Sequence, residues 1–191
     1  MANVSISNSG GYGIQTRRNE SEFPMQNMTF EDNDLGHAYI HTDQMGYFDN
    51  ASTFDSGYVL VYGGDTTADM NIANLNGAKY QIMTKSDFDH TVTIEAGTEF
   101  EFAADAGLDI NSGSEIIAQG TATDRIIFTG VSKVPGAWKG IYIGSSSVNN
   151  ILEYVDISYG GSSANRTYFD KTNLVIDLAK VTLPRCFDKR E

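Results

Sequence analysis

The sequence is poor in cysteine, in proline and in positive charge, and each shortage excludes a class of protein. Cys186 is the only cysteine, so the chain cannot form an intrachain disulfide. Only three prolines occur, which argues against a polyproline segment or a proline-rich linker. No stretch approaches the ~20 consecutive apolar residues of a membrane span, so no membrane insertion is expected.

The shortage of positive charge limits the kinds of partner that the protein is expected to bind. Lys and Arg together number 13 against 25 Asp and Glu, which gives a formal charge of -12. An acidic surface repels phosphate backbones, so nucleic acid is not expected as a partner. The same repulsion acts on anionic lipids and on polyanionic polysaccharides such as pectin or alginate, unless Ca²⁺ bridges the charges. The simplest consequence of the charge is solubility.

Short apolar or alternating runs recur along the chain, each bounded by Gly, Asn, Asp or Ser, and this pattern is typical of strands. The clearest runs are Val4–Ile6, Met28–Phe30, Ala38–Ile40, Tyr58–Tyr62, Tyr80–Ile82, Val92–Ile94, Phe100–Phe102, Leu108–Ile110, Glu115–Ile117, Arg125–Phe128, Gly140–Ile143, Ile151–Ile157 and Leu174–Leu183. Helical spacing is nearly absent. The one candidate helix, within Thr66–Asn76, also contains three asparagines, which oppose it.

The turns between these runs do not have the composition of hairpins. Asn76-Gly77 is the only Asn-Gly pair, and Asp-Gly does not occur. Many short strands without hairpin signals imply pairing between strands that are distant in sequence. A coil of parallel strands provides that pairing, because each turn bonds to the turns above and below it. The sequence therefore predicts an all-β, right-handed parallel β-helix, with a single domain over 1–191 and a non-helical tail over 185–191.

The stretch from Tyr80 to Gly161 resembles the pectin lyase-like, right-handed β-helix repeats of bacterial surface proteins. The resemblance rests on VTIEAGTEF (92–100), GTATDRIIFTG (120–130), PGAWKGI (135–141) and NNILEYVDISYGG (149–161). In that family a strand often runs on into a segment like NVSISNSGGYGI (3–14). Here that segment comes first and its usual preceding strand, Leu174–Leu183, comes last, so the chain resembles one unit of a longer array.

The resemblance implies the fold but leaves the activity open, because the same coil serves lyases, hydrolases, adhesins and stalks. It also implies an extracellular or cell-surface location. The opening residues Met1–Val4 have neither a basic n-region nor an apolar h-region, so the sequence predicts no signal peptide. The polar ending 185–191 differs from a further turn of the coil.

Acidic residues supply the candidates for a metal site and for catalysis. Asp32 and Asp34 are weak candidates for a calcium site, because side chains at i and i+2 of a strand lie on one face. A turn rich in Asp and Asn explains them equally well. Asp105 and Asp109 form a weaker cluster of the same kind.

Two pairs of acidic residues are candidates for the catalytic carboxylates of a glycoside hydrolase. The two carboxylates of such an enzyme stand at a set separation. Glu99 and Glu101 alternate with phenylalanines, so both carboxylates should leave one face of a strand, from backbone positions about 6.6 Å apart by strand rise. The same alternation is typical of any half-buried strand. Glu153 and Asp156, three residues apart, should point to opposite faces.

No cofactor is expected. His37 and His41 flank a predicted strand, where four residues span about 13 Å, too far to share an ion. The glycine-rich segment 10–13 lacks both the spacing and the following helix of a phosphate-binding loop.

Aromatic residues are the candidates for ligand contact. Trp138, Tyr142 and Tyr159, with Tyr154 among them, fall in one region, and exposed rings can stack on sugars. We take Trp138, Tyr142 and Tyr159 as candidate glycan contacts. The alternative is that these rings fill the interior of the coil and brace its turns.

The sequence leaves two functions open. The first is a non-catalytic structural or binding module of bacterial surface-protein type that contacts a glycan or a protein. The second is a fragment of a polysaccharide lyase or glycoside hydrolase whose chemistry lies in its acidic residues. The first function predicts no turnover on any glycan, and the second requires several acids or bases that converge in one groove.

We also expect self-association, most simply as a two-fold dimer joined end to end. A coil that ends in mid-turn exposes unpaired strand edges and open core, and both favour association. Light scattering at micromolar concentration should therefore give the mass of a dimer. A monomeric mass would contradict the expectation, unless a loop or the segment 185–191 caps an end.

Overall fold

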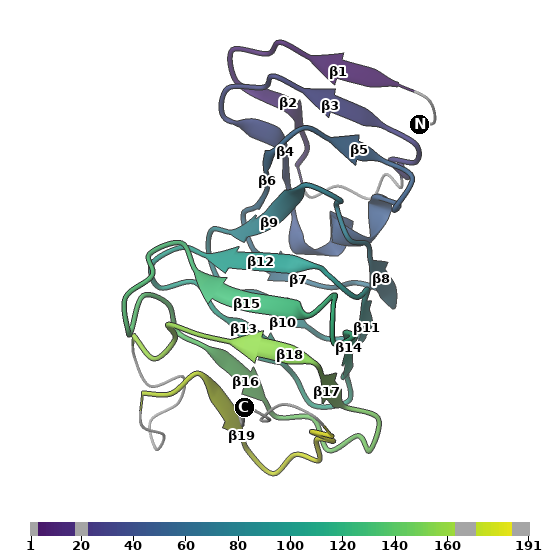
Figure 1. The fold of residues 1–191 in the computed structure, drawn as a ribbon. Coiled ribbons are helices and arrows are strands. Elements are labelled where there is room, and N and C mark those ends of the chain that lie inside the picture. Colours follow the sequence, from purple (N-terminus) through teal and green to yellow (C-terminus); the bar gives the residue numbers. More distant parts are fainter. Residues whose placement is uncertain (1–3, 18–22, 163–170, 185–191) are drawn as a thin grey trace.

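Short parallel strands wind into a solenoid in the computed structural model, which describes residues 4–17, 23–162 and 171–184. Every pairing between the described strands is parallel. Figure 1 shows the turns stacked along one axis from the N-terminal to the C-terminal strands. The predicted all-β parallel coil in a single domain is confirmed.

The described strands form four sheets. The largest has seven strands: β2 (Tyr12–Gln15), β4 (Gly36–Ile40), β6 (Gly57–Val61), β9 (Ala78–Ile82), β12 (Glu99–Phe102), β15 (Ile126–Gly130) and β18 (Val155–Ile157). The second has five: β7 (Gly64–Asp65), β10 (Ser86–Phe88), β13 (Leu108–Ile110), β16 (Ile141–Ile143) and β19 (Leu174–Ile176). The third has four: β8 (Met70–Ile72), β11 (Thr91–Ile94), β14 (Glu115–Gln119) and β17 (Ile151–Glu153). The last has three: β1 (Ser5–Ser7), β3 (Thr29–Glu31) and β5 (Thr53–Phe54).

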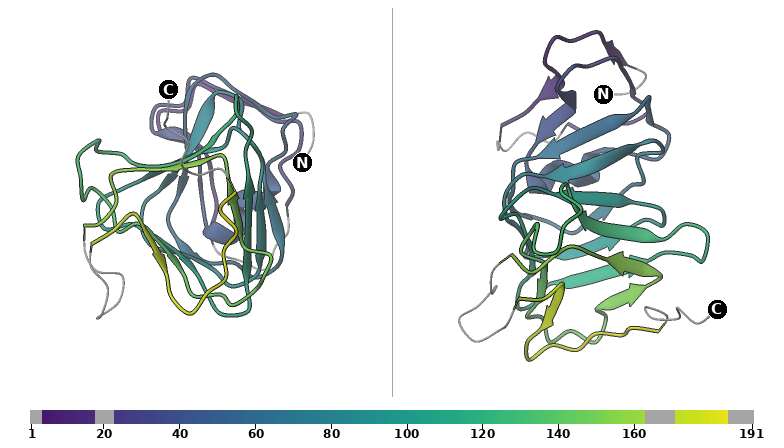
Figure 2. Two further views of the ribbon diagram at one scale, coloured as in Figure 1. Left: turned by 60° about the horizontal axis from the view of Figure 1, so that its bottom comes forward. Right: turned by 60° about the vertical axis from the view of Figure 1, so that its left-hand side comes forward.

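The sheets enclose one interior, and Figure 2 shows the successive turns following one another around it. Residues alternate between the interior and the outer surface along each strand, so the apolar positions of one turn lie above those of the next. In the seven-stranded sheet the ladder aligns Val59 with Tyr80, Tyr80 with Phe100 and Phe100 with Phe128. All four side chains are buried.

Stacked aromatic rings occupy much of this interior. The ring centroids of Tyr80 and Phe100 lie 5.4 Å apart and those of Phe100 and Phe128 lie 5.0 Å apart, with interplanar angles of 20° and 4°. Trp138 stacks on Phe102 at 4.0 Å. Offset stacking of this kind adds to the free energy gained by burying the rings.

A second aromatic cluster fills the N-terminal turns. The rings of Phe30 and Phe54 stack at 5.1 Å, and Phe48 meets both rings edge-on. His37 is buried against both Phe30 and Phe54, with Nε2 2.6 Å from the carbonyl oxygen of Ser56.

Several details differ from the expectations drawn from the sequence. The run Ile151–Ile157 is two strands, β17 and β18, which belong to different sheets and are separated by Tyr154 with its positive φ. The segment 66–76, the one candidate for a helix, contains strand β8, because neighbouring turns offer Met70–Ile72 a parallel partner in β11. A 3₁₀-helix, η1 (Thr42–Tyr47), lies where we predicted no helix. The run Leu174–Leu183 is a strand only over Leu174–Ile176. The segment 185–191, predicted to be a non-helical tail, lies outside the described residues.

The interior stack should dominate stability. Replacing Phe128 by alanine removes a fully buried ring from the stack and should cost about 3–5 kcal/mol of unfolding free energy. Its neighbour Ile127 points to the outer face of the same strand and is only half-buried, so Ile127→Ala should cost about 1 kcal/mol or less. Urea unfolding of both variants measures the difference, and equal losses would contradict this assignment of inner and outer faces.

Candidate functional site

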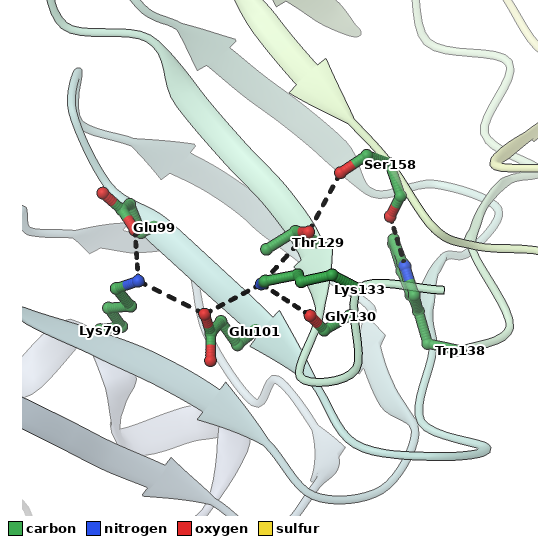
Figure 3. A network of polar contacts seen from close by, with 8 residues as sticks. All are labelled: Lys79, Glu99, Glu101, Thr129, Gly130, Lys133, Trp138 and Ser158. Atoms are coloured by element: carbon green, nitrogen blue, oxygen red, sulfur yellow. Dashed lines mark hydrogen bonds and ion pairs between the residues drawn. The ribbon is translucent and has the colours of Figure 1, made fainter. Parts of the chain in front are cut away.

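A network of charged and hydroxyl side chains lies on the outer face of the seven-stranded sheet (Figure 3). It begins on β9 with Lys79 and continues on β12 with Glu99 and Glu101, each of which alternates with a core residue. Because successive side chains of a strand point to opposite faces, burial of Tyr80 and Phe100 turns Lys79 and Glu99 outward. The predicted alternation of Glu99 and Glu101 with phenylalanines therefore places both carboxylates on one face.

Glu101 is the centre of the network. Its side chain is only 8% exposed, and its Oε1 accepts hydrogen bonds from two ammonium groups, Lys79 Nζ at 3.3 Å and Lys133 Nζ at 3.0 Å. Lys79 Nζ also lies 3.0 Å from Glu99 Oε2. Two lysines and two glutamates thus form one connected group whose formal charges cancel.

Lys133 reaches the sheet from the loop 131–137, which follows β15. Its Nζ donates to the carbonyl oxygen of Gly130 at 2.7 Å as well as to Glu101. The loop folds back tightly over Gly130: a Cβ atom there would lie 2.7 Å from the oxygen of Ser132 and 2.8 Å from Cβ of Ala137. The sequence therefore needs glycine at the point where the loop leaves the strand.

Hydroxyl groups extend the network toward the next turn of the coil. Thr129 pairs with Glu101 in the sheet, and its Oγ1 lies 3.5 Å from Lys133 Nζ and accepts from Ser158 Oγ at 3.0 Å. The carbonyl oxygen of Ser158 accepts from Trp138 Nε1 at 2.8 Å. The indole thus joins the interior stack to the outer network.

The hydrogen bond from Lys79 to Glu99 raises the pKa of the Lys79 ammonium, against the opposing effect of burial, and the nearby charge of Glu101 acts in the same direction. Lys79 therefore holds its proton more firmly than a lysine in water. Proton abstraction by a lysine requires the opposite shift, toward neutral pH. The arrangement suits charge pairing better than acid–base chemistry.

The three aromatic candidates occupy different environments. Trp138 is fully buried, so its ring fills the interior and has no surface to offer a ligand. Tyr142 is 5% exposed and donates its hydroxyl to Asp177 Oδ2 at 2.7 Å. Tyr159 is 36% exposed and lies beside the network, one residue after Ser158. For Trp138 and Tyr142 the structure agrees with the alternative interpretation, that the rings brace the coil.

The other acidic candidates do not gather with Glu99 and Glu101. Glu153 accepts from Gln119 Nε2 at 3.2 Å, whereas Asp156 pairs with Arg125 at 2.8 Å. Asp105 has a positive φ of 63° just after β12.

The weak metal candidates lie on an exposed turn between β3 and β4. Asp32 has a φ of 51°, in the left-handed region that Asp tolerates in turns, and its N–H donates to Asp55 Oδ2 at 2.9 Å. The N–H of Asp34 donates to the carbonyl oxygen of Ser9. His37 and His41 have separate partners, with His41 Nδ1 2.8 Å from Asp43 Oδ1. Among the described residues no group of three His, Cys, Asp or Glu side chains could hold a metal ion.

Sequence reasoning missed the lysines of the network, and it named Asp109 without finding the row of aspartates on another face to which Asp109 belongs. Asp65, Asp87 and Asp109 pair in register on β7, β10 and β13, and Lys85 Nζ lies 2.8 Å from Asp87 Oδ1 and 3.5 Å from Asp109 Oδ2. Their constant spacing of 22 residues is a signal that could have found them. Lys133 carries no comparable signal, because it lies in a loop.

Comparison with known families agrees with this geometry. Residues 64–168, more than half of the chain, match the family model described as a pectate-lyase like beta helix domain. The chain belongs to this family. No curated protein matches the chain, and no solved structure matches it either. None of the helices in the described part of the chain has the length and apolarity to span a membrane.

The two glutamates of the network should contribute unequally to the stability of the protein. Glu101→Gln removes the negative charge that two lysines share at a mostly buried position, and should cost about 1–3 kcal/mol of unfolding free energy. Glu99 is 37% exposed and meets one lysine, so Glu99→Gln should cost at most about 1 kcal/mol. Chemical denaturation of both variants compares them. A larger loss for Glu99→Gln would contradict the central place of Glu101.

Proposed function

We propose that the chain is a non-catalytic binding module of bacterial surface-protein type and that its ligand is a glycan. The observation that carries the proposal is the pairing of the charged groups on the outer face of the seven-stranded sheet with one another. Lys79, Lys133, Glu99 and Glu101 use their charges in mutual contacts. Such a surface is rigid and locally neutral, which suits recognition of a polymer chain that runs along the coil.

The protonation of the network supports binding over turnover. Efficient acid–base catalysis needs a group whose pKa lies near the working pH. The pKa of Lys79 is raised, away from neutrality, by its hydrogen bond to Glu99. Glu101 Oε1 accepts hydrogen bonds from two ammonium groups, and the side chain is only 8% exposed, which leaves this carboxylate little surface to offer a substrate.

One observation favours the alternative, a lyase or hydrolase. Glu99 and Glu101 both contact Lys79, so two carboxylates stand together on the outer face of the sheet, as a glycoside hydrolase requires, although only Glu99 is substantially exposed. The double variant Glu99→Gln with Glu101→Gln would remove both carboxylates from such an enzyme.

A glycan panel tests the proposal. The panel contains uncharged polysaccharides and polygalacturonate with and without Ca²⁺. Binding is measured by calorimetry, new reducing ends report hydrolysis, and ultraviolet absorbance reports the unsaturated sugars that a lyase forms. We expect binding without turnover. Turnover that the double variant abolishes would establish the enzyme instead, and the absence of both binding and turnover would contradict the proposal and leave a protein partner as the next candidate.

A further inference from the structure

Asn76-Gly77, the only Asn-Gly pair of the sequence, forms the turn that leads into β9. Both residues are exposed, and both have a positive φ, of 44° for Asn76 and 129° for Gly77. The side chain of Asn76 reaches the preceding turn of the coil, where its Nδ2 donates to the carbonyl oxygen of Asn50 at 3.1 Å. The pair thus lies at the surface, at a point where a side-chain hydrogen bond links two turns.

An asparagine that precedes glycine can react with its own main chain. The backbone nitrogen of the glycine bonds to the side-chain Cγ and loses its proton, and Nδ2 leaves with a proton as ammonia. Water then opens the cyclic imide at either of its carbonyl carbons, which gives aspartate or isoaspartate. Glycine favours ring closure because it has no Cβ to obstruct the approach of its nitrogen.

Three exposed asparagines of the described residues share the left-handed conformation. Their φ angles are 59° at Asn8, 51° at Asn27 and 44° at Asn76. Exposure and backbone conformation therefore do not distinguish them. The attacking nitrogen belongs to the residue that follows each asparagine, and the surroundings of that nitrogen differ among the three.

The nitrogens that follow the first two asparagines are engaged in hydrogen bonds. The N–H of Ser9 donates to Asn33 Oδ1 at 3.2 Å, and the N–H of Met28 donates to Ser52 Oγ at 3.1 Å. The N–H of Gly77 makes no hydrogen bond within the part of the chain that the structure describes. An attack by Gly77 therefore breaks no hydrogen bond, whereas an attack by either of the other two does.

We propose that Asn76 is a spontaneous deamidation site and that the reaction loosens the link between two turns of the coil. The product carries a carboxylate in place of the amide, so it cannot donate to the Asn50 carbonyl oxygen and repels it instead. The reaction also adds a negative charge to a chain whose formal charge is already -12. Isoaspartate in addition lengthens the main chain just before β9, the strand that carries Lys79 of the outer network.

Incubation of the folded protein in warm, mildly alkaline buffer tests the site, with peptide mapping by mass spectrometry at successive times. We expect conversion at Asn76 to be at least about tenfold faster than at Asn8 or Asn27, equivalent to about 1.4 kcal/mol in activation free energy. The same measurement in concentrated urea gives the rates of the unfolded chain. If Asn76 converts in urea but stays intact in the folded protein, the turn protects it and the proposal is overturned.

A second Asn-Gly pair separates the effect of glycine from that of the unbonded N–H. Ser9→Gly creates such a pair after Asn8 and keeps an N–H that can donate to Asn33 Oδ1. In the folded variant, verified by circular dichroism, Asn8 should convert at least about tenfold more slowly than Asn76, and in urea the two rates should be comparable. Equal rates in the folded variant would overturn the role given to the unbonded N–H.

Asn76→Asp reproduces the charge of the product and the loss of the amide. Asn8→Asp is the matched control, because it adds the same charge at another exposed, left-handed asparagine. Urea unfolding should give a lower midpoint for Asn76→Asp than for the wild type, and a nearly unchanged midpoint for Asn8→Asp. Wild-type protein aged until Asn76 has converted should show the same fall. Unchanged midpoints for both Asn76→Asp and the aged protein would contradict a loosened link between the turns.

Discussion

The structure depends on one constraint: each position of a turn must match the same position of the next turn. Parallel pairing in register sets Phe100 above Phe128 inside the coil, and it sets Glu101 above Thr129 outside it. A mismatch at one level would turn a core side chain toward water and an outer one toward the core. The interior stack and the outer network are therefore two sides of the same ladder.

This constraint also explains how a loop acquires a fixed place on the surface. The loop 131–137 has few regular bonds of its own, but it lies between two elements that the stack holds firmly. It begins at Gly130, the last residue of β15, and ends at Trp138, which is buried against Phe102. The Lys133–Glu101 contact then ties the middle of the loop to the sheet. The loop is thus fixed on the surface by a core residue, Trp138, at its end and by Glu101 of the outer face at its middle.

The sequence predicted the repeated features well and the local ones poorly. Runs such as Val92–Ile94 and Leu108–Ile110 alternate regularly, so their strands and their inner faces could be found from the pattern alone. The alternation of Glu99 and Glu101 with phenylalanine indicated their outward face for the same reason. The lysines that neutralise them could not be found, because their contacts join segments about one turn apart. The burial of Trp138 could not be predicted either, because an indole ring is equally compatible with a core and with a binding surface.

The turns of the coil differ in length although their strands keep one register. Ser86 pairs with Leu108, 22 residues later, whereas Leu108 pairs with Ile141, 33 residues later. The additional residues of the longer turn form loops that project from the coil. The strands on either side of each loop keep their parallel pairing with the neighbouring turns. Length is therefore variable at such points, at a modest cost in loop entropy. For protein engineering this makes the excursion after β15 a natural position for inserting a foreign recognition segment, so long as Lys133 and its contact with Glu101 are kept.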